Sequence, residues 1–160
     1  MSRVYRHYGC EMFSHGLFAA IENEPHFCKP RGGLWGSPLR EDGNTGWSEW
    51  CRDEKFHVDR LEKFFDFSLR EDSRITVVHT LHDLKILVRK YTRPIEDPIF
   101  PSTWTTRYLD FVLMSQDFDA IELTESGQWE TRLSTPSLYG WDCESVLVLT
   151  PAVVVPMTSP

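Results

Sequence analysis

The stretch 29-KPRGGLWGSP-38 combines two adjacent glycines, a large apolar pair and a serine followed by proline. A core strand has no need of Gly32–Gly33, and a simple turn has no need of Leu34–Trp35. Glycine lacks a Cβ, so another group can approach its backbone closely. The stretch therefore predicts a short strand over 33–37 that is entered through glycine and lies against something bound.

Length and charge limit the classes of protein to consider. A chain of 160 residues is long enough to bury a core without disulfides, and we expect one domain over residues 1–160. The formal net charge of −7 argues against a protein that binds the phosphate backbone of nucleic acid. A macromolecular partner is therefore expected to be a protein rather than a nucleic acid.

The ends of the chain and its cysteines suggest a compartment. The N-terminal MSRVYRHYG has no apolar segment of the kind found in signal peptides, and no run approaches 18 uninterrupted apolar residues. We therefore expect a cytoplasmic protein without membrane association. The four cysteines show neither a CxxC pair nor regular spacing, which predicts free thiols at Cys10, Cys28, Cys51 and Cys143.

Local patterns predict the elements of an α+β domain. Alternation and β-branched or aromatic content favour strands at 3–9, 33–37, 64–70, 74–80, 119–123, 145–151 and 153–156. Helical patterns favour 46–56, capped by Ser48, 81–91 with Leu81, Leu84, Leu87 and Val88 on one face, and 105–118 with Tyr108, Phe111, Val112 and Ser115. Residues 10–31 read as irregular. Because no repeating βαβ rhythm is present, a mixed sheet with short helices is expected.

The order of these pieces resembles that of a known family. The strand VYRHYG (4–9) is followed by GGLWGSP (32–38) and then by a short helix that carries tryptophan. The chain closes with DCESVLVLTPAVVV (142–155). This arrangement is similar to the ADP-ribosyltransferase superfamily, the toxin-like and phage-type enzymes that use NAD as substrate. The resemblance implies a split, mostly antiparallel sheet with a cleft between its halves.

The resemblance also implies roles for particular side chains. The first-strand Arg6 or His7 would bind NAD through a phosphate or the adenosine ribose, and Ser37 would hold the nicotinamide half. A late glutamate would bind the 2′-hydroxyl of the nicotinamide ribose and stabilise the oxocarbenium-like state as nicotinamide leaves. The activity implied is NAD-dependent mono-ADP-ribosyl transfer to a macromolecule.

The same roles make chemical sense without the family. Cleavage of the N-glycosidic bond of NAD builds positive charge on the ribose, which a fixed carboxylate stabilises. A pyrophosphate suits the guanidinium fork of Arg6. The nicotinamide amide needs backbone groups at close range, which Gly33 and Leu34 could supply, while Trp35 or Trp47 could offer a stacking surface.

Two glutamates compete for the catalytic role. Glu144 lies just before the last long strand, with Asp142 two residues earlier. Strand side chains repeat every two residues, so both carboxylates would point the same way, as in the acid-x-Glu motif of the family. The rival is Glu122, a carboxylate inside the apolar run DAIEL, which either is catalytic or faces solvent from an edge strand. We favour Glu144.

Other classes of function remain as alternatives. The family has Glu or Gln where this chain has Asp142, which leaves open a NAD glycohydrolase or a non-enzymatic binding module of the same fold. A zinc site would have to draw on Cys10, His15, His26, Cys28 and Cys51, whose spacing is irregular. No GxSxG motif for a serine hydrolase is present. We therefore expect no metal.

Overall fold

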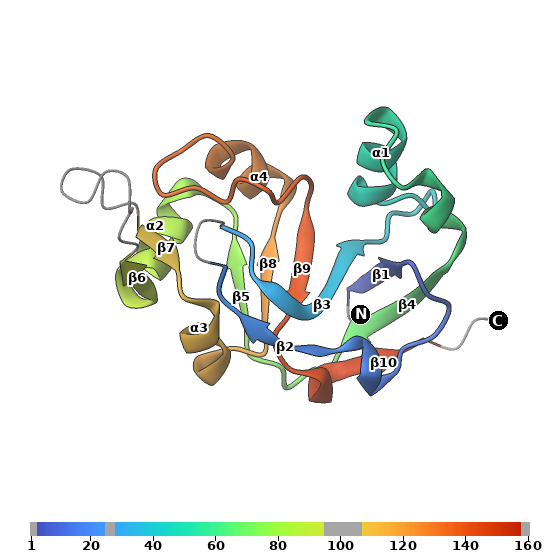
Figure 1. Cartoon of the computed structure of the whole chain (residues 1–160), viewed down its shortest axis with the longest axis horizontal. Helices are drawn as coiled ribbons and strands as arrows, with labels where there is room; N and C mark the ends of the chain where they lie inside the picture. Colours follow the sequence, from blue (N-terminus) through green and yellow to red (C-terminus); the bar gives the residue numbers. More distant parts are fainter. Residues whose placement is uncertain (1–2, 25–27, 95–106, 158–160) are drawn as a thin grey trace.

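The computed structural model describes residues 3–24, 28–94 and 107–157 and shows an α+β architecture (Figure 1). The strands are β1 (Val4–Tyr8), β2 (Ala19–Glu22), β3 (Arg31–Pro38), β4 (Phe64–Leu69), β5 (Ile75–Val78), β6 (Thr92–Pro94), β7 (Arg107–Leu109), β8 (Ala120–Leu123), β9 (Ser145–Val148) and β10 (Val154–Pro156). The helices are α1 (Gly46–Asp53), α2 (Leu81–Lys90), α3 (Phe111–Asp117) and α4 (Glu125–Thr131), with single 3-10 turns at η1 (His15–Leu17), η2 (Val58–Glu62) and η3 (Pro151–Val153).

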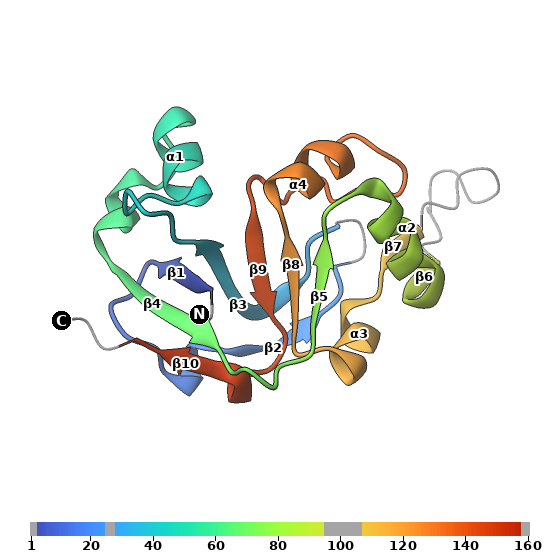
Figure 2. The ribbon, with the colours of Figure 1, turned by 180° about the vertical axis from the view of Figure 1, so that it is seen from behind.

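The main sheet is mixed and mostly antiparallel, as the sequence predicted. Its strand order is β10-β4-β1-β3-β9-β8-β5, with β2 also paired to β3. Only β5 and β8 run parallel among the pairs of the described residues. Strands β4 and β5 are close in sequence yet lie in opposite halves of the sheet (Figures 1 and 2).

Strand β3 joins the two halves of the sheet. One of its edges pairs with β9 through residues 34–36. Its other partners are β2, which reaches Arg31 and Gly33, and β1, which pairs only at Ser37 and Pro38. The ladder between β1 and β3 is therefore two residue pairs long. Beyond it the two strands are no longer paired, and the sheet is open between them.

The glycine pair serves this junction rather than a ligand, which corrects the interpretation of the opening stretch. Gly32 and Gly33 have φ of +77° and +68°, which L side chains rarely adopt. A Cβ on Gly32 would lie 2.1 Å from the carbonyl oxygen of Ala20 in β2. A Cβ on Gly33 would lie 2.7 Å from the carbonyl oxygen of Val148 in β9. Glycine is needed because neighbouring strands approach β3 from both sides.

Two apolar clusters cover the sheet. In the first, α2, α3 and the segment around Trp141 pack on β5, β8 and β9 through the following buried side chains: Val78, Leu84, Leu87, Val88, Tyr91, Leu109, Phe111, Met114, Ile121, Leu123, Leu138, Trp141, Leu147 and Leu149. The second joins the two halves of the sheet through Tyr5, Leu34, Phe65, Phe67, Leu69, Ala120, Val146, Val148 and Val153. Successive residues of β9, such as Val146 and Leu147, point to opposite faces of the sheet and therefore belong to different clusters.

Most predicted elements are confirmed, and the exceptions have local causes. Helix α1 is capped by Thr45, and Ser48 is instead the third helical residue of a capping box. The helix predicted over 105–118 is confirmed only from Phe111 to Asp117: β7 occupies Arg107–Leu109, and α3 starts after Asp110, whose side chain caps it. Of the predicted face Phe111 is buried but Val112 is exposed, and Met114 is buried in its place. Residues 105–106 lie outside the described residues.

Some elements were missed by the sequence analysis, and the structure also bears on disulfides, metal ligands and membrane helices. Strand β2 lies in the segment 10–31 predicted as irregular, and α4 was not predicted. All four cysteines are free thiols. Among the described residues there is no group of three His, Cys, Asp or Glu side chains that could hold a metal ion, and His26 lies outside them. No helix in this part of the chain has the length and apolarity to cross a membrane.

Candidate functional site

A cleft is lined by residues of β1, β3 and α1 and by residues just before β3 and β9. Figures 1 and 2 show where these elements lie in the fold. The cleft encloses about 260 Å³, near the lower end of the roughly 300–1,000 Å³ of sites for small molecules. Its lining comes from β1, β3, α1 and the start of β9: Arg6, His7, Tyr8, Lys29, Trp35, Gly36, Ser37, Trp47, Trp141, Asp142, Cys143 and Ser145.

One wall of the cleft is aromatic and carries a cation. The Trp35 and Trp141 rings meet edge to face at 4.6 Å between centroids. The ammonium of Lys29 lies 4.6 Å from the centroid of the Trp35 ring. Burial lowers the pKa of Lys29, and the charge of Asp142 partly offsets that effect. Lys29 makes no ion pair within 4 Å with any described residue. Its charge is therefore available to an anionic ligand.

Arg6, which also lines the cleft, already forms hydrogen bonds to other groups of the protein. Its Nε and Nη2 atoms donate to the two carboxylate oxygens of Asp66 at 2.6 and 2.8 Å, and Nη1 donates to the carbonyl of Gly43 at 3.3 Å. The guanidinium also lies 3.7 Å from the centroid of the Phe64 ring. The hydrogen bonds to Asp66 raise the pKa of Arg6. Arg6 therefore lines the cleft, but most of its donors are used.

His7 lies where the ladder between β1 and β3 stops. Its Nδ1 atom is 2.7 Å from the carbonyl oxygen of Trp35. Burial lowers the pKa of His7, although that hydrogen bond works in the opposite direction. The ring also contacts Phe65 at 5.3 Å between centroids. His7 is thus a neutral imidazole at pH 7, fixed by backbone and aromatic contacts.

The floor of the cleft carries two serines and a thiol. The hydroxyl of Ser37 donates to the carbonyl of Glu144 at 3.2 Å and accepts from the backbone N–H of Trp47 at 3.3 Å. Ser145 donates to the carbonyl of Cys143 at 3.0 Å. Burial raises the pKa of the Cys143 thiol to about 11, so it stays protonated at neutral pH. Ser37 therefore ties α1 to the start of β9 and keeps only acceptor capacity.

Asp142 supplies the carboxylate of the cleft. Its side chain is half-buried, and it has no hydrogen bond or ion pair to any described residue; the contact from Gln128 reaches its backbone carbonyl instead. A carboxylate without a hydrogen bond or ion pair to the described residues, placed in an aromatic cleft, is available to a developing positive charge.

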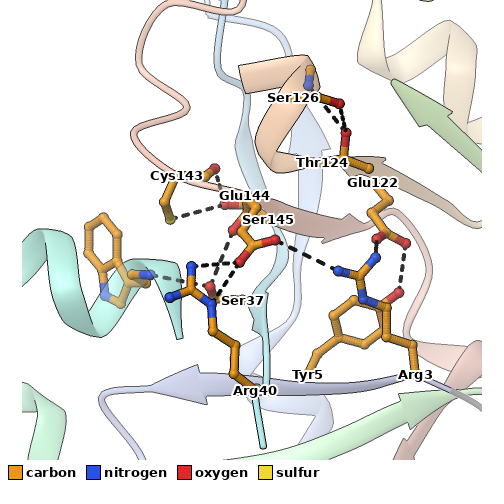
Figure 3. Close-up of polar contacts among 12 residues, drawn as sticks. Arg3, Tyr5, Ser37, Arg40, Glu122, Thr124, Ser126, Cys143, Glu144 and Ser145 are labelled. Atoms are coloured by element: carbon orange, nitrogen blue, oxygen red, sulfur yellow. Dashed lines mark hydrogen bonds and ion pairs between the residues drawn. The ribbon is translucent and has the colours of Figure 1, made fainter. Parts of the chain in front are cut away.

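The two predicted glutamates are not in the lining of the cleft, and Figure 3 shows them in one network with Arg3, Tyr5 and Arg40. In the β8–β9 ladder Glu122 is opposite Val146, and Leu123 is opposite Ser145. Ser145 lines the cleft, while Val146 belongs to the second apolar cluster. Because strand side chains alternate, Glu122 points away from the cleft.

The carboxylate of Glu122 is buried and has two protein partners. It is 5% exposed, so the solvent-facing edge strand considered for it is wrong; β8 is an interior strand. The Tyr5 hydroxyl donates to it at 2.8 Å, and the Arg3 guanidinium forms an ion pair with it. Burial, followed by the charge of Glu122, raises the pKa of Tyr5.

Glu144 joins the same network. Its carboxylate accepts from Arg40 at 3.0 Å and lies 3.7 Å from the second Nη atom of Arg3, which thereby bridges it to Glu122 (Figure 3). Arg40 in turn pairs with Glu49 at 2.6 Å. The prediction that Asp142 and Glu144 point the same way is wrong, because a bend at residues 143–144 interrupts the strand period before β9 begins.

The structure thus divides the predicted site into two groups. Arg6, His7, Trp35, Ser37 and Trp47 come together in the cleft. Gly33, Leu34, Glu122 and Glu144 are not part of its lining. The sequence reasoning treated Asp142 only as a partner of Glu144 and missed the other lining residues, which are Tyr8, Lys29, Gly36, Trp141, Cys143 and Ser145. Lys29 could have been found from the sequence, since it is the first residue of the stretch 29–38 that contains Trp35 and Ser37.

No model of a known protein family matches the chain, and no curated protein or solved structure matches it.

Proposed function

We propose that the cleft binds NAD and that the protein is an NAD-dependent mono-ADP-ribosyltransferase with a sheet of the ADP-ribosyltransferase type. The observation that carries the proposal is that residues of three separate stretches expected to contact NAD line one cleft: Arg6, His7, Trp35, Ser37 and Trp47. Lys29 and Asp142, neither of which forms an ion pair within 4 Å with a described residue, lie in the same lining. NAD carries both groups that these charges would recognise.

The binding roles follow from the groups that the protein leaves free. Trp35, Trp47 and Trp141 line the cleft, and a flat nicotinamide or adenine ring can stack on one of them. Lys29 takes a phosphate oxygen, because its ammonium has no carboxylate partner within 4 Å in the described chain. Arg6 keeps two N–H groups beyond those given to Asp66 and Gly43 and plays a secondary part. The cleft accommodates one half of the dinucleotide more readily than the whole.

The chemical step needs a carboxylate near the ribose. The bond between C1′ and the nicotinamide nitrogen breaks, its electron pair stays on nicotinamide, and positive charge develops on the ribose. Asp142 stabilises that charge from within the cleft. Glu122 and Glu144 are held by Arg3, Arg40 and Tyr5 on the other side of the sheet, and they are assigned to the fold.

The acceptor of ADP-ribose is proposed to be a protein. The net charge of −7 disfavours a nucleic-acid backbone as partner. Water is the alternative acceptor, which would make the protein a NAD glycohydrolase. A second candidate, a non-enzymatic module that binds NAD, is favoured by the absence of both glutamates from the lining of the cleft.

Incubation of the full chain with NAD, followed by chromatography of the products, tests the proposal. Release of nicotinamide with transfer of label from NAD to protein in a lysate supports the transferase, and release of free ADP-ribose alone supports the glycohydrolase. Calorimetric binding of NAD without release of nicotinamide identifies the binding module. Absence of both binding and release contradicts the proposal.

A further inference from the structure

His7 offers chemistry that the binding roles above do not use. It lies directly after the last paired residue of β1 and β3, Arg6 and Ser37, so that no backbone ladder follows it on the β3 side. Its side chain instead reaches the carbonyl of Trp35 at 2.7 Å. The imidazole therefore lies at the opening of the sheet, in the lining of the cleft.

The hydrogen bond determines which ring nitrogen carries the proton. A carbonyl oxygen can only accept, so Nδ1 of His7 donates to Trp35. In the neutral ring, Nε2 then keeps its lone pair and can accept a proton. Burial lowers the pKa of His7 from its ordinary value of 6.5, which keeps the ring neutral at pH 7.

The lone pair on Nε2 is accessible. No described residue makes a hydrogen bond to this atom. In the described chain the buried polar side-chain atoms without a partner are Ser73 Oγ and Thr92 Oγ1, so Nε2 of His7 is not among them and solvent reaches it. An oriented, accessible and neutral imidazole nitrogen in a cleft is the arrangement that general-base catalysis requires.

We propose that His7 is the general base that accepts the proton of a hydroxyl nucleophile in the cleft. This inference rests on the proposed function and specifies the acceptor as a hydroxyl group, either of water or of a serine, threonine or tyrosine side chain. The hydroxyl oxygen forms a bond to C1′ as the bond from C1′ to nicotinamide breaks. The hydroxyl proton moves to Nε2 of His7, and solvent later removes it.

Other charged or titratable groups near His7 could also affect the dependence of the rate on pH. On its own strand Arg6 is paired with Asp66 and Tyr8 contacts Thr45. The ring packs on Phe65 of β4 and on the Trp35 carbonyl of β3. The remaining charged or titratable groups of the cleft are Lys29, Asp142 and Cys143.

The test compares wild type with His7→Asn, whose amide nitrogen can still donate to the Trp35 carbonyl but which has no basic nitrogen. Methanol is added as a probe hydroxyl, and nicotinamide, ADP-ribose and methyl ADP-ribose are measured across pH 5 to 8. In wild type, formation of both ADP-ribose products falls as pH decreases through the lowered pKa of His7, because the base becomes protonated. In His7→Asn the rate is lower by about a hundredfold and this limb disappears.

Controls separate the base role from simple loss of structure. His82→Asn changes an exposed histidine of α2 and should behave like wild type. An acidic limb due to His7 should disappear in His7→Asn, whereas a limb due to any other group would persist. Imidazole added to His7→Ala should restore part of the rate. Calorimetric NAD binding by His7→Asn equal to that of wild type shows that the cleft is intact.

Three results overturn the inference. They are a wild-type profile without an acidic limb, an acidic limb that is unchanged in His7→Asn, and a His7→Asn variant that keeps the wild-type rate. In each case wild type still releases nicotinamide, so the proposed function survives. A wild-type protein that releases no nicotinamide instead contradicts the proposed function itself.

Discussion

Carboxylates lie on both sides of the sheet around β3, but they differ in whether protein groups pair with them. On the side of the second apolar cluster, Glu122 and Glu144 are bound by Arg3, Arg40 and the Tyr5 hydroxyl. On the side of the cleft, Asp142 has no side-chain partner in the described chain, although it lies only two residues from Glu144.

This difference indicates which charges belong to the fold and which to a ligand. A buried carboxylate costs free energy unless it is paired, so the partners of Glu122 and Glu144 explain their presence without a function. Asp142 and Lys29 keep partly hydrated charges at an aromatic wall and have no such explanation. We therefore assign the arginine-bound carboxylates to stability and the unpaired groups to binding and chemistry.

The largest effect is expected for Asp142→Asn. If Asp142 stabilises the charge on the ribose, its loss lowers the rate of nicotinamide release by about a thousandfold, equivalent to about 4 kcal/mol in the activation barrier. Binding of NAD should change little, because the carboxylate acts mainly on the transition state. Nicotinamide release under saturating NAD measures the first effect and calorimetry the second.

Glu144→Gln is the matched variant for this comparison. Its amide still accepts from Arg40, and we expect its rate to stay within a few-fold of wild type. If Glu144→Gln abolishes turnover while Asp142→Asn leaves it unchanged, the division between the two sides is wrong.

Gly33→Ala should cause the next largest effect, on stability. The residue has φ of +68°, and a Cβ would lie 2.7 Å from the backbone oxygen of Val148. We expect the free energy of unfolding, measured with urea, to fall by about 3 kcal/mol. Gly43→Ala is the control, since Gly43 has φ of +80° but nothing within 4 Å of an added Cβ. Its loss should be about 1 kcal/mol. Equal losses would show that close approach of the strands is not the reason for glycine.

Glu122→Ala should lower stability without altering the chemistry directly. It leaves the buried Tyr5 hydroxyl without its acceptor and Arg3 without one of two carboxylates. A loss of about 2 kcal/mol in the free energy of unfolding follows from the unsatisfied hydroxyl. Asp72→Ala breaks the exposed pair of Arg70 and Asp72 and should lower stability much less than Glu122→Ala does. A Glu122→Ala protein as stable as wild type would contradict a stabilising role for Glu122 and make it a catalytic candidate again.

The smallest effect is expected for Lys29→Met. The thioether keeps an apolar side chain against Trp35 but removes the charge. The KM for NAD should rise about tenfold with little change in kcat, because a phosphate contact is present in both ground and transition states. Lys85→Met, on the exposed surface of α2, should leave both constants unchanged. An unchanged KM in Lys29→Met would show that Lys29 does not contact a phosphate and would assign that contact to Arg6.

Local sequence was enough to predict what depends on neighbouring residues. The aromatic and β-branched runs form β1, β4 and β8, and the apolar spacing of Leu84, Leu87 and Val88 gives the buried face of α2. The α+β class and the mixed sheet followed from the order of these elements, whereas the mostly antiparallel pairing was expected from the family resemblance. Predicted site residues that line the cleft, such as Trp35 and Ser37, alternate within one strand and therefore share a face.

The tertiary structure decided which groups meet across long separations in the chain. Glu122 finds Tyr5 and Arg3 more than a hundred residues away, so its burial and pairing could not be read from DAIEL. The bend at 143–144 separates Asp142 from Glu144 although period-two spacing predicted one direction for both. The glycine pair is explained only by the approach of β2 and β9 to β3. Composition and periodicity describe how a side chain relates to its own element, whereas its partner depends on the packing of elements that are distant in sequence.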